Sequence, residues 1–375
     1  MHNHILGLEK RGVGGRIGFV VSTKTSVVRL RDIAKKLNVS VSTVSRALGK
    51  ETSNLVAPEL RKKIREVAWE ARYIPHPAAQ LMRKPNIHLI TVLLPFNSGI
   101  FLSDYYGTVL SGVISASRDL GTETRVALIG DTEADGEIAE QMQRVAIGAG
   151  GLFYTARPLD ADELAKIEDL GRPVVVISGC LPPGIELSAI HVNTVGSDNV
   201  TGAYEITREL LQLGHRRIGF INGLATSRDA GERGTGFLKA MKEHGGIIDP
   251  RIMVRGDFSS EAGMLGWQQI KRHGPLPTAV VCGNDAIAFG VLESLAADKI
   301  NCPGQVSVVG FDDTRGAVHV TPKLTTVRQP IAQLGRAATE LLIRRLQTEG
   351  GPEVEHLVFP MEIIRRQSMA PPGAA

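Results

Sequence analysis

The stretch RLRDIAKKLNVSVSTVSRALG, residues 29–49, decides the fold of the N-terminal part of the chain. Apolar residues recur in both of its halves at the spacing of a helix face: Ile33, Ala34, Leu37, Val44, Ala47 and Leu48. Between the halves, Asn38 favours a left-handed corner and Ser40 favours a helix N-cap. The pattern predicts a helix-turn-helix, whose second helix can lie in the major groove of DNA. The alternative interpretation is an ordinary helical hairpin with a basic solvent face.

Positive charge is concentrated around this motif. The whole chain has a formal net charge of only +4, yet residues 24–84 hold 14 Lys and Arg against 5 Asp and Glu, so the rest of the chain is acidic. A basic module on an acidic body suits a polyanion that binds at one end only. We therefore expect double-stranded DNA as a partner.

A third helix is predicted directly after the motif. Pro58 can begin it, and Leu60, Ile64, Val67 and Ala71 repeat at steps of four, three and four. This helix would close a small core under the first two. The following segment YIPHPAAQLMRKP, residues 73–85, has room for one more helix that is too short to be stable alone in water.

This order of elements resembles the LacI/GalR family of bacterial transcription regulators. The resemblance implies that the linker is a hinge helix that folds on operator DNA, with Met82 as the side chain wedged into the minor groove. It also implies that Val41, Ser42 and Arg46 read bases in the major groove. Leu30 and Ser40 match positions that pack on or contact the DNA backbone.

From about residue 86 the sequence alternates between strand and helix patterns. Apolar runs, each next to an amphipathic segment, occupy residues 87–96, 125–129, 151–154, 173–177, 217–222, 278–283 and 305–311. Such alternation predicts an α/β fold with parallel sheets that carry helices on both faces. About 290 residues are too many for one sheet, so we expect two Rossmann-like subdomains with a cleft between them.

The family resemblance extends over this body, which is similar to periplasmic sugar-binding proteins. We expect five parts, with the following bounds: a disordered arm at 1–26, the helix-turn-helix domain at 27–75, the hinge helix at 76–85, subdomain 1 at about 86–191 and 328–350, and subdomain 2 at about 192–327 and 351–370.

Ligands of parallel α/β folds bind beyond the carboxyl ends of the strands, and several polar residues follow predicted strands here. Asn284 and Asp312 are candidates for binding hydroxyl groups, together with Arg233 on a helix, while Phe258 offers a flat face to a sugar ring. For the neighbouring Asp285 and Asp313, capping of a helix or turn is the favoured interpretation.

The resemblance implies an effector cleft lined by Arg233, Phe258, Asn284, Asp312 and Gln329. Thr155 and Ser178 are further candidates from the first half of the body. Where many relatives have an acidic residue after the fourth strand, this chain has Ser178-Gly179.

Several classes of function are disfavoured. No run of 18 apolar residues supports a membrane span, and three cysteines without metal-ligand spacing indicate reduced thiols in a cytoplasmic protein. No nucleophile, base and orienting group assemble into a catalytic motif, so we expect neither an enzyme, a cofactor nor a metal. A sugar-transport protein and a sugar-converting enzyme remain alternatives.

The favoured function is a homodimeric repressor whose operator affinity is changed by a small molecule, a sugar or a derivative. Co-repression by a purine or nucleoside is the second candidate. The C-terminal sequence QSMAPPGAA lacks a leucine heptad, which favours a dimer over a tetramer.

Overall fold

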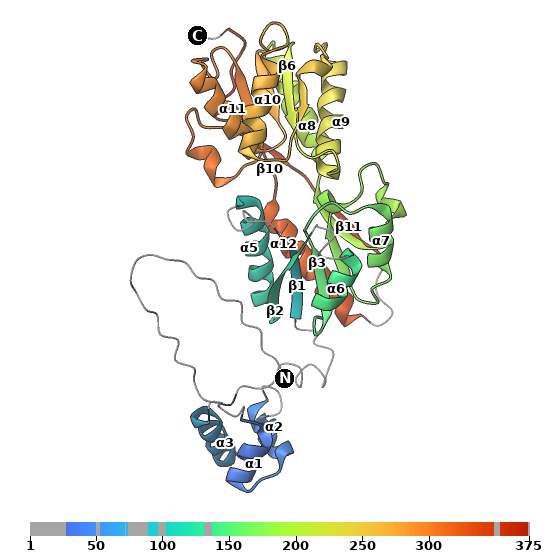
Figure 1. The fold of residues 1–375 in the computed structure, drawn as a ribbon, viewed down its shortest axis with the longest axis vertical. Coiled ribbons are helices and arrows are strands. Elements are labelled where there is room, and N and C mark those ends of the chain that lie inside the picture. The colour runs from blue at the N-terminus through green and yellow to red at the C-terminus, as the bar shows by residue number, and fades with distance from the viewer. Residues whose placement is uncertain are drawn as a thin grey trace, which may run out of the picture. The chain divides into compact units, whose positions relative to one another are not determined.

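The computed structural model describes residues 28–49, 53–71, 73, 89–96, 103–130, 137–348 and 353–373, and the chain divides into two compact units, residues 1–83 and 84–375 (Figure 1). The expected arm at 1–26, the hinge helix at 76–85 and Met82 lie outside the described residues. No helix within the described ranges is long and apolar enough to cross a membrane.

The N-terminal unit is the expected helix-turn-helix with a third helix. Its helices are α1 Leu30–Leu37, α2 Val41–Leu48, the short 3-10 turn Ser53–Leu55 and α3 Pro58–Glu70. Asn38 makes the corner in the left-handed region, at φ 52°, and Ser40 Oγ caps α2 by accepting a hydrogen bond from the Thr43 amide at 3.0 Å. The apolar faces of the three helices meet in one core: Ile33, Ala34, Val44, Ala47, Val56, Ile64, Val67 and Ala68. The pattern of residues 29–49 is therefore confirmed.

The larger unit contains two six-stranded sheets, as the alternating pattern predicted. The first has the order β11-β5-β4-β3-β1-β2 and is parallel throughout. Its strands are β1 Leu89–Pro95, β2 Glu123–Ile129, β3 Gly151–Tyr154, β4 Val174–Ile177, β5 Asn193–Ser197 and β11 His356–Phe359. Its helices are α5 Asp104–Asp119, α6 Ile138–Ala146, α7 Ala161–Glu168 and α12 Ile331–Gln347.

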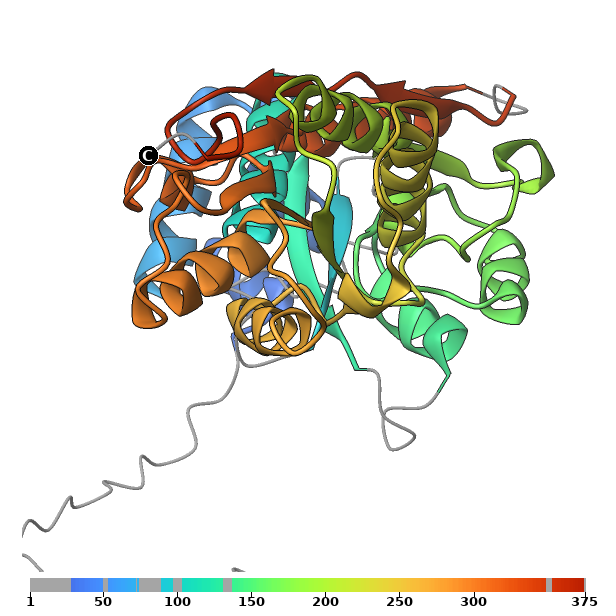
Figure 2. The same cartoon turned by 90° about the horizontal axis from the view of Figure 1, so that it is seen from above.

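The second sheet has the order β12-β10-β9-β8-β6-β7, and its β10–β12 pair is antiparallel. Its strands are β6 Ile218–Asn222, β7 Met253–Arg255, β8 Ala279–Cys282, β9 Ser307–Asp312, β10 Thr325–Arg328 and β12 Glu362–Ile364. Its helices are α8 Asn199–Gln212, α9 Arg228–Glu243, α10 Ser260–Ile270 and α11 Asp285–Ala297. Figure 2 shows the pair α8–α9 and the pair α10–α11 on opposite sides of this sheet.

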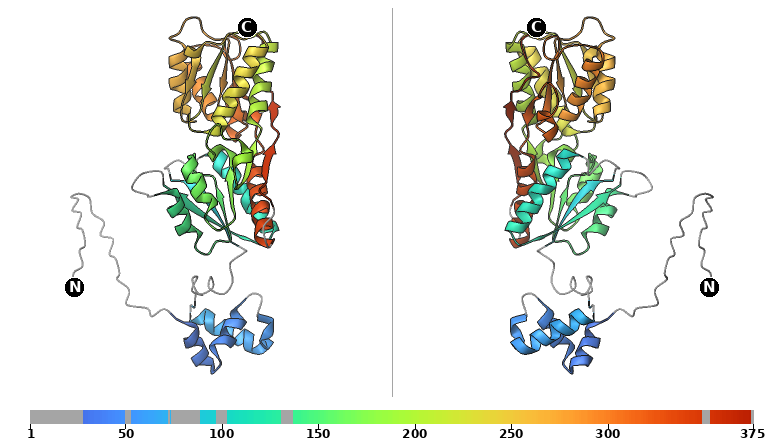
Figure 3. Two further views of the ribbon diagram at one scale, coloured as in Figure 1. Left: turned by 90° about the vertical axis from the view of Figure 1, so that its right-hand side faces the viewer. Right: turned by 90° about the vertical axis from the view of Figure 1, so that its left-hand side faces the viewer.

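The chain crosses between the two sheets three times, after β5, after β10 and after β11, and Figure 3 shows the C-terminal strands running from one sheet to the other. The expected subdomain bounds near 191 and 351 were wrong. Residues 193–197 pair with β4, and residues 356–359 pair with β5, so both segments belong to the first subdomain. The pattern of apolar runs missed β5 because this strand is rich in small and polar residues, NTVGS.

Close packing of α5 against α12 holds a late segment of the chain in the first subdomain. A Cβ atom on Gly112 would lie 1.9 Å from the carbonyl oxygen of Ala332, and a Cβ atom on Gly335 would lie 2.2 Å from that of Val109. Glycine at both positions therefore lets the two helices touch.

We expect Gly112→Ala to lower the free energy of unfolding of the full chain by about 1–3 kcal/mol, because the added methyl group overpacks this contact. Gly107 on the same helix has open space around its Cβ position, so Gly107→Ala is the matched control and should be neutral or stabilising by up to about 1 kcal/mol. Urea unfolding of both variants measures the difference, and equal effects would contradict the packing argument.

Candidate DNA-binding helix and ligand cleft

Helix α2 has one apolar side that is buried in the core and one polar side that is exposed to solvent. Val44 and Ala47 are fully buried, while Val41, Ser42 and Arg46 are exposed on the other side. Ser42 Oγ lies 2.7 Å from Ser40 Oγ, so part of its hydrogen-bonding capacity is already used by the cap. The face can enter a major groove, and Arg46 is its longest side chain.

Leu30 and Ser40 have structural roles within this unit. Leu30 is half-buried and packs on the three-helix core, and Ser40 caps α2.

The larger unit buries a guanidinium group at the junction of the two subdomains. Arg233 on α9 is only 4% exposed. Its Nε donates to Asn199 Oδ1 at 2.8 Å, its Nη1 donates to the carbonyl oxygen of Gly283, and its Cζ lies 4.2 Å from the ring centre of Phe311. A buried cation needs such partners, because its transfer out of water is otherwise costly.

Two carboxylates flank the same guanidinium. Nη2 of Arg233 lies 4.0 Å from Asp229 Oδ2 and 4.0 Å from Asp312 Oδ1. Asp312 accepts a hydrogen bond from Gln329 Nε2 and has a positive φ of 109° at the end of β9. Burial is the main cause that raises the pKa of Asp312, to about 6. The structure thus brings Arg233, Asp312 and Gln329 close together.

Asn284 and Asp285 divide their roles differently from the prediction. Asn284, rather than Asp285, caps α11, and its Nδ2 also donates to the carbonyl oxygen of Phe258 at 3.0 Å. Asp285 is completely buried and accepts hydrogen bonds from Thr314 and from Thr326 Oγ1. Asp285 therefore connects α11 with the turn after β9 and with β10. Burial, and then the charge of Asp312, raise its pKa to about 7.

Phe258 is held in an unusual conformation near Arg233. Its φ is +69°, and a Cβ atom on Gly223 would lie 2.0 Å from its Cζ, so the ring lies directly on the backbone after β6. The guanidinium of Arg233 is 6.0 Å from the ring centre. A non-glycine residue with positive φ is rare, and such conformations cluster at ligand sites.

The first subdomain contributes residues that the sequence analysis named and others that it missed. The Ser178 hydroxyl is close enough to Asp229 to offset part of the rise in the pKa of that carboxyl group. Thr155 is buried after β3, where its amide donates to the Leu93 carbonyl at 3.1 Å. The missed residues are Tyr105 and Tyr106 on α5, whose rings meet edge to face with centres 5.3 Å apart. Burial and then the charge of Asp229 raise the pKa of Tyr105.

The other missed residues are Asn199, Asp229, Glu232 and Phe311. Asp229 and Glu232 were detectable, because they precede Arg233 by four and one positions on the same helix. Asn199 had no such signal, since it comes from α8, thirty-four positions before Arg233.

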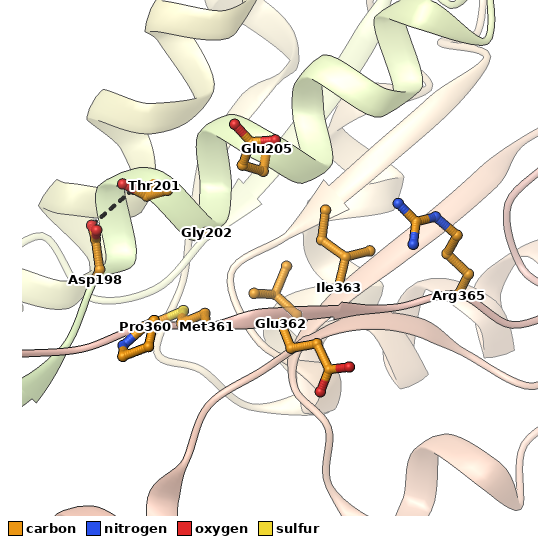
Figure 4. Close-up of a pocket in the computed structure, with 10 residues that line it drawn as sticks. Asp198, Thr201, Gly202, Glu205, Pro360, Met361, Glu362, Ile363 and Arg365 are labelled. Atoms are coloured by element: carbon orange, nitrogen blue, oxygen red, sulfur yellow. Dashed lines mark hydrogen bonds between the residues drawn. The ribbon is translucent and has the colours of Figure 1, made fainter.

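A hollow of about 400 Å³ lies away from this cluster, between α8 and the β11–β12 segment (Figure 4). Its charged side chains already have partners. Glu362 pairs with Arg328 at 3.1 Å, Arg365 pairs with Glu209 at 2.7 Å, and Asp198 caps α8 through the Thr201 amide. A smaller hollow of about 260 Å³ reaches Asp312 and Gln329 from the side of α5. The second hollow is the one that connects with the Arg233 cluster.

The two units together define a class of protein. One is a helix-turn-helix unit with a polar, basic recognition face, and the other is a two-subdomain body with carboxylate, amide, guanidinium and aromatic groups at the carboxyl ends of its strands. Such groups bind hydroxyl-rich small molecules. The class is a DNA-binding regulator with a ligand-binding body.

Comparison with known families agrees with this class. Residues 29–76 match the family "Bacterial regulatory proteins, lacI family", and residues 207–369 match the "Periplasmic binding protein-like domain". The N-terminal unit is therefore similar to the lacI family of bacterial regulatory proteins, and the body is similar to the periplasmic binding protein-like domain.

Similar proteins cover nearly the whole chain. The transcriptional repressor CytR of Escherichia coli is 29% identical over 92% of this chain and 97% of its own, and the repressor PurR of Erwinia tasmaniensis is 29% identical over 91% and 96%. Among solved structures, a complex of the regulator CelR with cellobiose has a TM-score of 0.69 at 26% identity, over 91% of this chain and 100% of that one. The lac repressor dimer bound to operator and an anti-inducer has a TM-score of 0.77 at 23% identity, over 92% and 99%.

We predict that the contribution of Asp285 to the free energy of unfolding depends on pH. Because its pKa is raised in the folded protein, the folded state holds this proton more tightly than the unfolded state, and the group's contribution to stability falls as pH rises from about 4 to about 7. Asp285→Asn removes the ionisable group and with it this pH-dependent decrease in stability. The stability of the variant relative to the native protein should therefore increase between pH 5 and pH 8, as measured by urea unfolding at each pH.

Asp249→Asn is the control for this experiment. Hydrogen bonds from Arg251 and Arg217 lower the pKa of Asp249, so its stabilising effect is complete above about pH 4 and is lost only at lower pH. Its stability relative to the native protein should stay constant between pH 5 and pH 8. A flat difference for Asp285→Asn as well would contradict the buried position of that carboxyl group.

Proposed function

We propose that this protein is a homodimeric repressor that binds operator DNA through α2. Its affinity for the operator changes when a small molecule occupies the Arg233 cleft. The observation that carries the proposal is the combination in one chain of an exposed recognition face and a buried polar cleft. A transport protein would have no use for the first, and a DNA-binding module alone would have no use for the second. The alternative of a sugar-converting enzyme lacks a recognised nucleophile and base.

Arg46 carries most of the direct readout in this proposal. Val41 and Ser42 are small, and Ser42 already shares a hydrogen bond with Ser40. A guanidinium group can bind a guanine edge with two hydrogen bonds. Specificity then depends also on the expected hinge helix and on Met82, as the family resemblance implies.

The effector cleft involves both subdomains. Arg233, Asp312 and Gln329 come from the second subdomain, while Ser178 and Tyr105 come from the first. A ligand that contacts both favours one relative orientation of the subdomains, and this shift of population would be transmitted to the hinge helices. A sugar or a sugar derivative fits the hydroxyl-binding groups, and a nucleoside is the second candidate, since CytR and PurR are among the similar proteins.

In the proposed dimer, a second copy of the chain covers an apolar strip on the surface of the first subdomain. Strand β2 is an edge strand, and its Val126 and Leu128 are exposed, as is Ile114 on the adjacent α5. Exposed edge strands with apolar side chains are normally covered. A dimer that covers β2 and α5 also brings two recognition helices to one operator. Such a repressor acts where the operator is, in the cytoplasm.

We expect Arg46→Ala to weaken binding to the operator by about 1–3 kcal/mol if it contacts a guanine. The operator is first selected from random duplex DNA with the native protein, and affinities are measured by fluorescence anisotropy. Arg31→Ala on α1 removes the same charge and is the matched control. It should weaken operator and unrelated DNA equally, whereas Arg46→Ala should reduce the ratio between them. An unchanged ratio would make Arg46 a phosphate contact.

We expect Val126→Lys to convert the dimer into monomers, because a charged side chain would face its own copy across the symmetric interface. Val358→Lys is the control, since Val358 is exposed on β11, the opposite edge strand of the same sheet. Sedimentation velocity distinguishes the two masses. A dimer that persists in Val126→Lys and dissociates in Val358→Lys would place the interface at the other edge.

A further inference from the structure

Helix α9 brings more charge to the cleft than the family resemblance assigned. Arg228, Asp229 and Glu232 lie beside Arg233, within one helical turn and a half. Asn199 Nδ2 links two of them, because it donates to Asp229 Oδ1 at 3.0 Å and to Glu232 Oε2 at 3.2 Å. Arg228 forms an ion pair with Glu232 at 2.6 Å and also donates to the Ile185 carbonyl of the first subdomain.

Asp229 reaches across to the first subdomain at the end of β4. A Cβ atom on Gly179 would lie 2.6 Å from Asp229 Oδ2, and the neighbouring Ser178 hydroxyl offsets part of the rise in the pKa of this carboxyl group. The carboxylate therefore occupies space that a side chain at position 179 would need. The end of β4 therefore has a carboxylate beside it that is supplied from α9.

The Nη2 nitrogen of Arg233 is not in direct hydrogen-bonding contact with the two carboxylates beside it. Among the described residues, this nitrogen has only two partners, Asp229 Oδ2 and Asp312 Oδ1, both at 4.0 Å. These distances are too long for hydrogen bonds, which need about 2.7–3.2 Å. A hydroxyl oxygen placed between the three groups can accept from Nη2 and donate to one carboxylate, which satisfies the guanidinium and the carboxylate together.

The same groups oppose an anionic ligand. Asp229, Glu232 and Asp312 carry three acidic groups, and Arg228 and Arg233 carry two basic ones, of which Arg228 is already paired with Glu232. Burial raises the pKa of all three carboxyl groups, which means that the ionised form of each carboxyl group is already disfavoured here. A phosphate would add one or two negative charges at this place, and like charges in a buried site repel strongly.

We propose that Asp229 is a ligand-binding and specificity residue of the effector cleft, and that with Glu232 and Asp312 it selects an uncharged or amine-bearing, hydroxyl-rich effector over the phosphorylated form of the same molecule. This inference rests on the proposed function of the cleft. Asp229 accepts a hydrogen bond from a ligand hydroxyl group beside Arg233 and so takes part in recognition. Because Asp229 also contacts the first subdomain, it takes part in the closure of the cleft as well.

The test is a thermal-unfolding panel on the full-length protein with matched pairs of ligands. The pairs are D-ribose, D-glucose, D-glucosamine, cytidine and adenosine, each with its phosphate monoester, and inorganic phosphate is included alone. A ligand that binds the folded state raises the unfolding temperature. We expect at least one unphosphorylated member to stabilise the protein and its phosphate ester to bind at least about 10-fold more weakly by calorimetry, a loss typical of one unfavourable charged contact.

Asp229→Asn tests the residue itself, because it keeps the shape and removes the charge. We expect the affinity for the stabilising ligand to fall about 10-fold or more and the discrimination against its phosphate ester to narrow. Asp162→Asn, the same change at an exposed position in the first turn of α7, is the matched control and should leave both affinities unchanged. Circular dichroism and binding to operator DNA show whether the Asp229→Asn protein is folded. If it is unfolded, the ligand panel on the native protein still tests the discrimination against phosphate esters.

Three outcomes overturn the inference: tighter binding of a phosphate ester or of inorganic phosphate than of the uncharged partner, no stabilisation by any unphosphorylated member of the panel, or unchanged discrimination in a folded Asp229→Asn protein. The first and third of these leave the proposed function intact, because an effector still binds. Failure of the proposed function is seen separately, as the absence of a selected operator sequence or as operator affinity that no bound ligand changes.

Discussion

The buried guanidinium of Arg233 is the constraint on which the cleft depends. A cation at 4% exposure is tolerated only where its partners are fixed, and these partners come from distant segments: Asn199 on α8, the Gly283 carbonyl after β8 and the ring of Phe311 on β9. The requirement to satisfy one charged group thus draws the ends of three elements together. The same requirement leaves Nη2 at 4.0 Å from two carboxylates, where a ligand can complete its coordination.

Backbone strain accompanies this arrangement at the end of β9. Asp312 and Asp313 both have positive φ, which costs about 1–3 kcal/mol for each residue outside glycine. Asp313 is held by ion pairs with Arg328 at 2.7 Å and with Arg366 at 2.6 Å, and Asp312 is held by Gln329. Arg328 and Gln329 lie where the chain leaves β10 for the other subdomain. The strained turn is therefore connected directly to one of the three crossovers.

Local patterns in the sequence predicted the parts of the fold in which apolar spacing and burial agree. The helix-turn-helix and the seven apolar strands are such parts. Strands β5 and β10 were not predicted, because Thr194 and Thr326 are buried through hydrogen bonds to His356 and Asp285, partners that sequence spacing does not reveal. The cleft shows the same limit. Motifs located Arg233 and Asp312, whereas Asn199 and Tyr105 join them only through the tertiary fold.

The contacts across the cleft bear on how an effector could act. Arg228 donates to the Ile185 carbonyl and Asp229 lies against Gly179, so the two subdomains already share contacts. A ligand changes their relative orientation only by the difference in its binding free energy between the two orientations, and a nearly complete switch requires about 5.5 kcal/mol. Hydrogen bonds to charged groups contribute about 1.5–3 kcal/mol each, so two to four of them suffice. Asp229 and Arg233 can supply this difference, because Asp229 contacts the first subdomain while both are carried by the second.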